Sequence, residues 1–299
     1  MKKKELFIPL SILATSVLFV GCGGGGSSSV KTTGPGGYPI LGENKSVVLE
    51  AMSAEVDYTS TGNIATSVSP MGIVNTSTTE LIFENKVLKK LIITTPHSTF
   101  TWSAASGDSF GQVPNYPRQT IFEDTAATFA AVLSGEWDYQ TFGAWRTGFG
   151  LGAGTVGAIS AGYKTEGPAL PVVGTSTFTG KLLGAYTNQA GNGNFVEGMV
   201  SVASDFSARS LAFTTTDSNL YNLSNGVVTA SAPGLDMSGT LTYSPGVNSF
   251  SGAVTAPGLG LSGLASGAFF GPNAEELGGV FDLKGAGVEY YVGGFGASQ

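Results

Sequence analysis

The stretch MSGTLTYSPGVNSFSGAVTAPGLGLSGLASGAFF, residues Met237–Phe270, decides the fold. It contains three segments of strand length, with a Pro-Gly turn after each of the first two: Met237–Tyr243, Asn248–Thr255 and Leu259–Phe270. In the first segment apolar side chains alternate with Ser and Thr, so that Leu241 and Tyr243 lie on one face. Because no helical crossover separates the segments, we expect them to pair as an antiparallel meander.

The same rhythm extends outward from this stretch in both directions. Further strand-sized segments are Trp137–Trp145, Thr177–Thr187, Asn194–Ala203, Ser210–Thr216, Gly226–Ala232, Leu277–Leu283 and Glu289–Phe295. About eight such strands close readily into a small barrel, and closure removes exposed strand edges. We therefore predict an all-β, mainly antiparallel protein with a C-terminal eight-stranded up-and-down β-barrel over residues 137–299. The Ser/Thr-rich outer faces favour a water-soluble barrel over a membrane-spanning one, which would carry aromatic girdles.

Residues 38–136 carry shorter and less regular β signals, among them Val87–Thr94 with its Ile-Ile-Thr run. We expect an N-terminal β-rich domain here. Ser106–Arg118 is polar and contains Gly and Pro, which predicts a loop. Phe122–Leu133 has apolar residues at helical spacing but also a high Thr content, so that one short helix and a strand remain almost equally good interpretations.

The first residues predict export and an anchor. Lys2, Lys3 and Lys4 precede an apolar run that is too short to span a membrane, and Gly21 precedes the chain's single cysteine. We interpret residues 1–21 as a lipoprotein signal peptide and Cys22 as the acceptor of acyl chains, palmitate among them. The alternative is an ordinary signal peptide with a free thiol. Residues 22–37 are the lipidated cysteine and a flexible Gly/Ser tether, and the absence of Asp after Cys22 predicts delivery to the outer membrane.

Composition excludes several functions. The 299 residues include 14 Lys or Arg and 21 Asp or Glu, and removal of residues 1–21 takes away three Lys and one Glu, which brings the formal net charge from −7 to −9. An acidic chain lacks the basic surface that nucleic acids require. The mature chain is also expected to meet a membrane only through its anchor. One Cys and one His exclude an internal disulfide and a multi-Cys or multi-His metal site, and we predict no resident cofactor.

No motif in the chain predicts catalysis. GAGTVG at 152–157 matches a dinucleotide fingerprint but lacks the strand-turn-helix context, and chance matches are expected with 45 Gly residues. His97, next to Pro96, reads as a turn residue, although it is a weak candidate for haem ligation. Glu275 and Glu276 are adjacent, which suits a solvated turn better than paired catalytic acids. We therefore expect a protein that is not an enzyme.

The segment GAFFGPNAEELGGVF, Gly267–Phe281, resembles the signature hairpin of the superfamily of transferrin-binding protein B and factor H binding protein. The segments Trp137–Trp145, Gly174–Gly180 and Asp205–Leu211 resemble further strands of that family. The matching signature positions are Gly267, Phe270, Gly271, Asn273, Ala274, Glu276, Gly278, Gly279 and Phe281. These residues read as scaffold: glycines for bends, Phe270 and Phe281 for the core, and Glu276 for capping backbone N–H groups.

The resemblance implies a surface lipoprotein of one lobe, in which a handle domain at 38–136 packs on the barrel at 137–299. It also implies a non-catalytic receptor that captures a host or environmental protein, of the iron-carrier type, through handle and barrel loops. Two alternatives stay open: a lipoprotein that binds haem or a haemoprotein, with His97 or a Tyr as ligand, and a structural or adhesive surface protein without a specific ligand. The ligand-binding residues cannot be carried over, because they lie outside the shared motif.

Overall fold

The computed structural model describes residues 46–85, 87–113, 116–124, 129–133, 137–148, 150–222 and 227–299. These residues form almost nothing but antiparallel strands, with three single-turn 3₁₀ helices at Ala104–Ser106, Gly167–Ala169 and Pro233–Leu235. Within the described part, no helix is long and apolar enough to cross a membrane. The predicted all-β class is confirmed.

The first sheet has nine strands in the order β4-β3-β2-β1-β9-β8-β7-β6-β5. Its strands are β1 (Ser46–Thr61), β2 (Ile64–Glu84), β3 (Val87–Thr94), β4 (Thr99–Ser103), β5 (Ser109–Val113), β6 (Tyr116–Glu123), β7 (Phe129–Leu133), β8 (Gln140–Arg146) and β9 (Ala153–Gly162). Strand β1 lies at the centre of the core because both of its faces are covered: Val47, Leu49 and Ala51 on one side, Met52, Ala54 and Val56 on the other.

The second sheet closes into a barrel of eight strands. They are β10 (Thr175–Thr187), β11 (Gly193–Asp205), β12 (Ser210–Asn222), β14 (Ser238–Tyr243), β15 (Phe250–Ala256), β16 (Leu261–Phe270), β17 (Glu276–Lys284) and β18 (Tyr290–Ser298). Pairing of β10 with β18 and of β11 with β12 completes the ring. A further strand, β13 (Val227–Ser231), pairs with the C-terminal part of β12. The predicted eight-stranded barrel is confirmed, with every neighbour antiparallel.

Three details differ from the sequence-based expectations. Strands β8 and β9 lie within the range expected for the barrel, but they hydrogen-bond to β7 and β1 in the first sheet. The prediction of a loop at residues 106–118 is wrong, because strands β5 and β6 form an antiparallel pair in this region, which begins at Ser109↔Glu123. The strand interpretation of Phe122–Leu133 holds and the helix does not, because Phe129 pairs with Glu123 on β6 and with Arg146 on β8.

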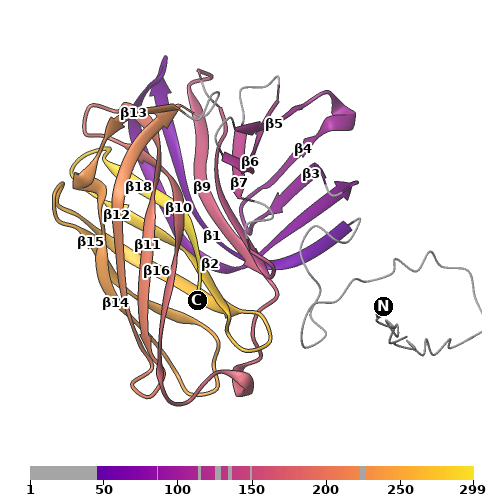
Figure 1. Cartoon of the computed structure of the whole chain (residues 1–299). Coiled ribbons are helices and arrows are strands. Elements are labelled where there is room, and N and C mark those ends of the chain that lie inside the picture. The colour runs from indigo at the N-terminus through magenta and orange to yellow at the C-terminus, as the bar shows by residue number, and fades with distance from the viewer. Residues whose placement is uncertain are drawn as a thin grey trace, which may run out of the picture.

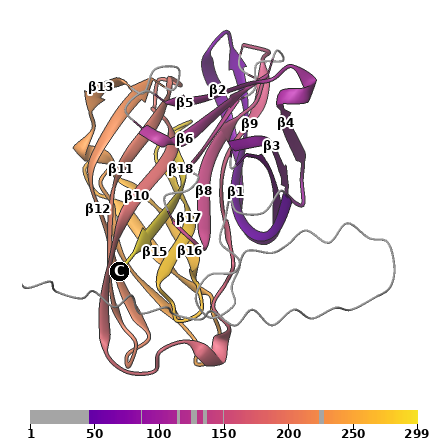
Figure 2. The ribbon, with the colours of Figure 1, turned by 45° about the vertical axis from the view of Figure 1, so that its right-hand side comes forward.

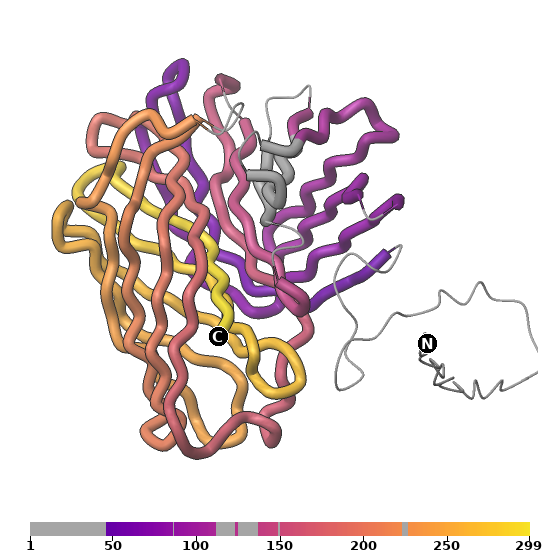
Figure 3. Tube along the Cα trace, viewed as in Figure 1, coloured from indigo at the N-terminus to yellow at the C-terminus, as the bar shows by residue number. Residues whose placement is uncertain are grey.

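The two sheets lie side by side and share a core. Figures 1 and 2 show the first sheet against one side of the barrel wall, and the tube in Figure 3 follows the chain from the sheet into the barrel. A buried apolar cluster joins Met52, Val56 and Phe142 of the first sheet to Leu183 and Val292 of the barrel. Glycine allows this close approach: a Cβ on Gly296 would stand 2.6 Å from the Phe142 ring.

The barrel interior is filled with side chains. Phe269 is surrounded by the rings of Phe178, Phe206, Tyr243 and Phe250, at centroid distances of 6.0, 5.8, 5.7 and 5.5 Å. All of these belong to one buried cluster that occupies the barrel. A filled eight-stranded barrel is a rigid scaffold rather than a ligand container, which leaves the barrel ends and the junction of the sheets as places for a functional site.

Candidate functional site at the junction of sheet and barrel

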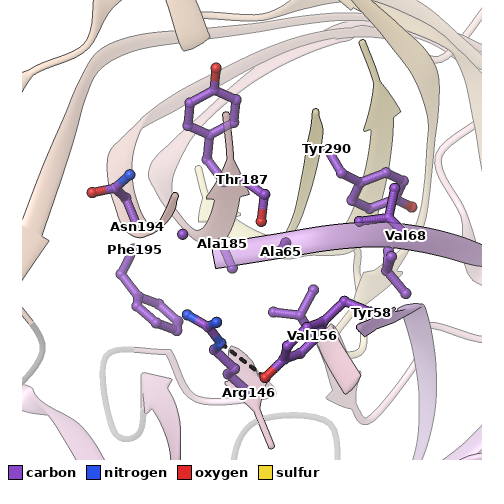
Figure 4. Close-up of a pocket in the computed structure, with 13 residues that line it drawn as sticks. Tyr58, Ala65, Val68, Arg146, Val156, Ala185, Thr187, Asn194, Phe195 and Tyr290 are labelled. Carbon is purple, nitrogen blue, oxygen red and sulfur yellow. Dashed lines mark hydrogen bonds between the residues drawn. The ribbon is translucent and has the colours of Figure 1, made fainter. Parts of the chain in front are cut away.

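A small pocket opens where the two sheets meet (Figure 4). The first sheet contributes Val56, Tyr58, Ala65, Val68, Arg146 and Val156, and the barrel contributes Ala185, Tyr186, Thr187, Gly193, Asn194, Phe195 and Tyr290. Its volume of about 20 Å³ accommodates one or two water molecules. It is far too small for a haem, so that a partner would meet this site as a surface feature.

Arg146 and Tyr58 give the pocket its polarity. The Arg146 Nε–H donates to the Tyr58 hydroxyl at 3.3 Å, and this hydroxyl donates to the Thr147 carbonyl at 2.6 Å. The guanidinium carbon lies 5.1 Å from the centre of the Tyr58 ring, within the range of a cation–π interaction. Arg146 is 9% exposed. The pocket therefore places a buried guanidinium beside an aromatic ring.

The barrel side of the pocket is fixed by a buried acid. Glu289 accepts a hydrogen bond from the Tyr186 hydroxyl at 2.6 Å and from the Gln189 amide at 3.0 Å. Burial and this bond to Glu289 raise the pKa of Tyr186 well above its usual value. Burial, with the Asp282 carboxylate nearby, does the same for Tyr290. Both tyrosines are neutral donors at physiological pH, so that neither is an activated base.

Three turns meet beside the pocket, and we call their described residues the junction surface: the β1–β2 turn at Thr61–Ile64, the β8–β9 turn at 147–148 and 150–152, and the β10–β11 turn at 188–192. The Ser60 N–H donates to the Gly152 carbonyl at 2.7 Å, and the Ala65 N–H donates to the Gly191 carbonyl at 2.9 Å. Gly191 has φ +83°, and a Cβ there would stand 2.3 Å from the Ala65 carbonyl oxygen. Ile64 and Leu151 are exposed on this surface, at 41% and 68%.

The signature residues lie at the other end of the barrel, in the β16–β17 hairpin. The Glu276 carboxylate accepts from the backbone N–H groups of Asp138 at 2.8 Å and Tyr139 at 3.2 Å. Burial raises the pKa of Glu276 to about 7, although these N–H groups favour the ionised form. Gly267, Phe270, Gly271, Asn273, Ala274, Gly278, Gly279 and Phe281 form the rest of the hairpin and its turn. The motif therefore clamps the segment before β8 onto the barrel and leaves the junction surface free.

Other sequence-predicted residues lie apart from the pocket. His97 is exposed in the β3–β4 turn, where its backbone N–H donates to the Thr95 hydroxyl at 3.2 Å. Glu275 accepts from the backbone and side-chain N–H groups of Asn273 in the β16–β17 turn. In the described ranges, no three His, Cys, Asp or Glu side chains gather as a metal site. Cys22, the signal peptide and the tether lie outside the described residues.

Glu55 is a buried acid that no sequence pattern singled out. It is 1% exposed on the face of β1 that looks away from the barrel, and neither carboxylate oxygen has a hydrogen-bond partner in the described part of the chain. Burial raises the pKa of Glu55, and the nearby Thr95 and His97 side chains oppose that shift. The pocket residues Arg146 and Tyr58 were also missed, because they are 88 positions apart and only the folded sheet joins them.

The described chain thus consists of a closed β-barrel and a nine-stranded sheet that packs on the barrel wall. Residues 170–299 match the family model described as the C-lobe and N-lobe beta barrels of Tf-binding protein B. These residues therefore form a barrel domain of the transferrin-binding protein B type, as the Gly267–Phe281 motif predicted. No curated protein matches the chain by sequence.

Several solved structures align with most of this chain at low sequence identity. The haemoglobin receptor HpuA from Kingella denitrificans aligns over 85% of this chain and 89% of its own, with 12% identity and a TM-score of 0.46. A transferrin-binding protein B variant from Actinobacillus pleuropneumoniae H49 aligns over 84% and 99%, with 16% identity and a TM-score of 0.45. A transferrin-binding protein B variant from Haemophilus parasuis Hp5 aligns over 82% of this chain and 60% of its own, with 14% identity and a TM-score of 0.44. This chain thus spans about three fifths of that last protein.

Proposed function

We propose that this chain is a non-catalytic receptor lipoprotein of the outer membrane that binds a protein partner, with an iron carrier of the transferrin type as the first candidate. The match of residues 170–299 to the barrels of Tf-binding protein B carries the proposal. The lipoprotein signal with Cys22 and the Gly/Ser tether support it, because a receptor of this kind must be held at a membrane and extend from it.

The junction surface is the part of the molecule that we assign to the partner. Strand β1 starts at Ser46, the first described residue, and ends at the β1–β2 turn, so that this turn lies a whole strand length from the point where the described chain begins. Exposed apolar residues beside a guanidinium and tyrosines are typical of protein-binding surfaces. Ile64 and Leu151 would supply apolar contacts.

Haem binding is less well supported than protein binding. The junction pocket holds only water-sized groups, and the barrel core is filled with aromatic side chains. His97 is exposed in the β3–β4 turn. In the described ranges, no group of three His, Cys, Asp or Glu side chains lies close enough together to hold a metal ion. Absorption spectra during haem titration test this alternative directly, because ligation by His97 would shift the Soret band and His97→Ala would abolish the shift.

The proposed function is tested with the soluble chain from residue 22 onward, carrying Cys22→Ser, immobilised on a biosensor. Transferrin and haemoglobin are the probes. We expect saturable binding of one probe and at least about tenfold weaker binding by Leu151→Asp, because a charge would enter an apolar contact. The matched control is Val173→Asp, an exposed apolar residue at the opposite barrel end. Equal affinity of the Leu151→Asp chain would contradict the assigned surface, and no binding of either probe would contradict an iron carrier as partner.

A further inference from the structure

The junction pocket contains a buried positive charge. Among the residues that line it, Arg146 of β8 is the one side chain that is charged at neutral pH, and it is 9% exposed. The other polar groups of the lining are neutral: the tyrosine hydroxyls, the Thr187 hydroxyl and the Asn194 amide. No Asp or Glu is among the described residues that line the pocket. A buried guanidinium is stabilised when a negative charge lies beside it.

The guanidinium of Arg146 reaches from the first sheet to the barrel. Its Nε–H donates to the Tyr58 hydroxyl, and its two Nη atoms lie on the other side of the group, towards Phe195 and Asn194 (Figure 4). A Cβ on Gly193, at the start of β11, would stand 2.8 Å from Nη1 and 3.8 Å from Nη2. Because glycine has no Cβ, the Nη atoms approach the barrel backbone closely. The positive end of Arg146 therefore lies at the barrel side of the pocket.

Two barrel residues beside Gly193 bring neutral hydrogen-bond donors to the same pocket. Thr187 is the last residue of β10 and Asn194 follows Gly193 in β11, and both side chains belong to the lining. Thr187 is fixed in place on both sides, because it pairs with Gly193 of β11 and with Tyr290 of β18. A hydroxyl and an amide N–H both donate to anions. The pocket thus combines one cation from the first sheet with two neutral donors from the barrel.

Two carboxylates bond to tyrosines of the pocket but do not line it. Glu289 accepts from the Tyr186 hydroxyl at 2.6 Å, and Asp282 accepts from the Tyr290 hydroxyl at 3.3 Å. Neither acid is among the lining residues. Both tyrosine protons are thus directed to carboxylates outside the lining, so that the charge that faces the pocket itself is that of the guanidinium.

The volume of about 20 Å³ limits the size of the occupant. Room for one or two water molecules suits a monatomic ion and is too small for sulfate, phosphate or a carboxylate ligand. We propose that the junction pocket binds a single halide ion, with chloride as the abundant natural case, between Arg146 of the first sheet and Thr187 and Asn194 of the barrel. The ion joins the two sheets, because its ligands come from both. This inference does not depend on the proposed receptor function.

The test compares chloride with an anion that is too large for the pocket. The chain from residue 22 onward, carrying Cys22→Ser, is unfolded by heat in mixtures of sodium chloride and sodium gluconate at one total concentration. A constant ionic strength keeps the screening of surface charges constant. An ion that binds only the folded state raises Tm with its own concentration. Arg146→Gln removes the cation of the pocket, and Arg209→Gln, the same change at an exposed position between β11 and β12 at the opposite barrel end, is the matched control.

We expect Tm to rise as chloride replaces gluconate in the native chain and in Arg209→Gln, and to stay constant in Arg146→Gln. Equal Tm in both salts would overturn the proposal, and so would a rise that persists in Arg146→Gln, because a general salt effect would then explain it.

A second measurement on the native chain covers the case in which Arg146→Gln does not fold. Crystals grown in sodium bromide should give an anomalous scattering peak in the pocket, within hydrogen-bond distance of the Arg146 Nη atoms. A pocket without such a peak at saturating bromide would show that it holds water and would overturn the proposal.

Discussion

The Glu276 carboxylate, in the hairpin that carries the family motif, accepts a hydrogen bond of 2.8 Å from the backbone N–H of Asp138, which precedes β8. This contact joins segments 138 residues apart and ties the first sheet to the barrel. The Gln140 amide adds a bond of 2.7 Å to the Leu277 carbonyl on the same hairpin. The most specific sequence motif of the chain thus holds two sheets together and takes no part in the proposed binding surface.

Glu276→Gln should make the stability of the protein less dependent on pH. Burial raises the pKa of Glu276 from its ordinary 4.5 to about 7. An acid with a raised pKa in the folded state contributes stability fully below pH 4.5 and loses it as the pH rises through 7. The lost contribution is on the order of 3 kcal/mol. Urea unfolding at pH 5 and pH 8 should show a smaller difference for the variant than for the native chain.

The control for this prediction is Glu275→Gln, which changes the neighbouring, partly exposed acid. It should leave the pH dependence of unfolding as it is in the native chain. Glu276→Ala should lower stability at both pH values, because two buried N–H groups then lose their acceptor. An unchanged pH profile for Glu276→Gln would mean that this carboxyl titrates normally in the fold.

Glu55→Gln should stabilise the protein at neutral and higher pH. The Glu55 carboxylate is buried without a hydrogen-bond partner among the described residues, and burial raises its pKa. Its stabilising contribution is therefore present below pH 4.5 and declines as the pH rises through the folded-state value. We expect a gain of about 1–3 kcal/mol at pH 8 and almost none at pH 4.5. Thermal unfolding at the two pH values measures it.

The charges around Glu55 sharpen this test. Asp57 raises the pKa of Glu55 further and His97 lowers it. His97→Ala should thus strengthen the decline of stability with pH in the native background and have no such effect beside Glu55→Gln. If His97→Ala acts equally in both backgrounds, the two side chains are not coupled.

The sequence predicted the barrel well because its signals are local. Pro-Gly turns and alternating segments such as Met237–Tyr243 determine which residues form strands and that neighbours pair in order. Local signals did not show that β8 and β9 belong to the first sheet. Every residue of β8 is buried, as in a barrel strand, yet its partners are β7 and β9. That choice depends on contacts such as Gln140–Leu277, which no local pattern encodes.

The junction pocket was beyond prediction for the same reason. Tyr58 and Arg146 occupy strands β1 and β8, and the pocket closes only when β10 and β11 of the barrel approach them. The exclusion of multi-Cys and multi-His sites follows from residue counts alone, since counting residues needs no fold. Nothing in the sequence pattern indicated that Glu55 is buried, because a Glu in an alternating strand usually points to solvent.

Gly191→Ala should loosen the junction surface. Gly191 has φ +83°, and a Cβ would lie 2.3 Å from the Ala65 carbonyl oxygen, so that both the backbone and the contact between the turns are strained. We expect a loss of about 1–3 kcal/mol and faster hydrogen exchange at the Ala65 amide, which bonds to the Gly191 carbonyl. Gly62→Ala is the matched control, since Gly62 has φ +59° and open space around it. Equal costs for both variants would show that only the backbone angle matters.

Phe269→Ala tests how strongly the aromatic cluster around Phe269 stabilises the barrel. Phe269 is fully buried and faces four aromatic rings within 6.0 Å, so that its removal leaves a large cavity in a rigid wall. We expect a loss of about 3–5 kcal/mol in the free energy of unfolding. Val173→Ala, at an exposed position before β10, should change stability by less than about 0.5 kcal/mol. A loss below about 1 kcal/mol for Phe269→Ala would mean that the barrel collapses around the cavity, contrary to the rigid scaffold that the pairing of eight strands implies.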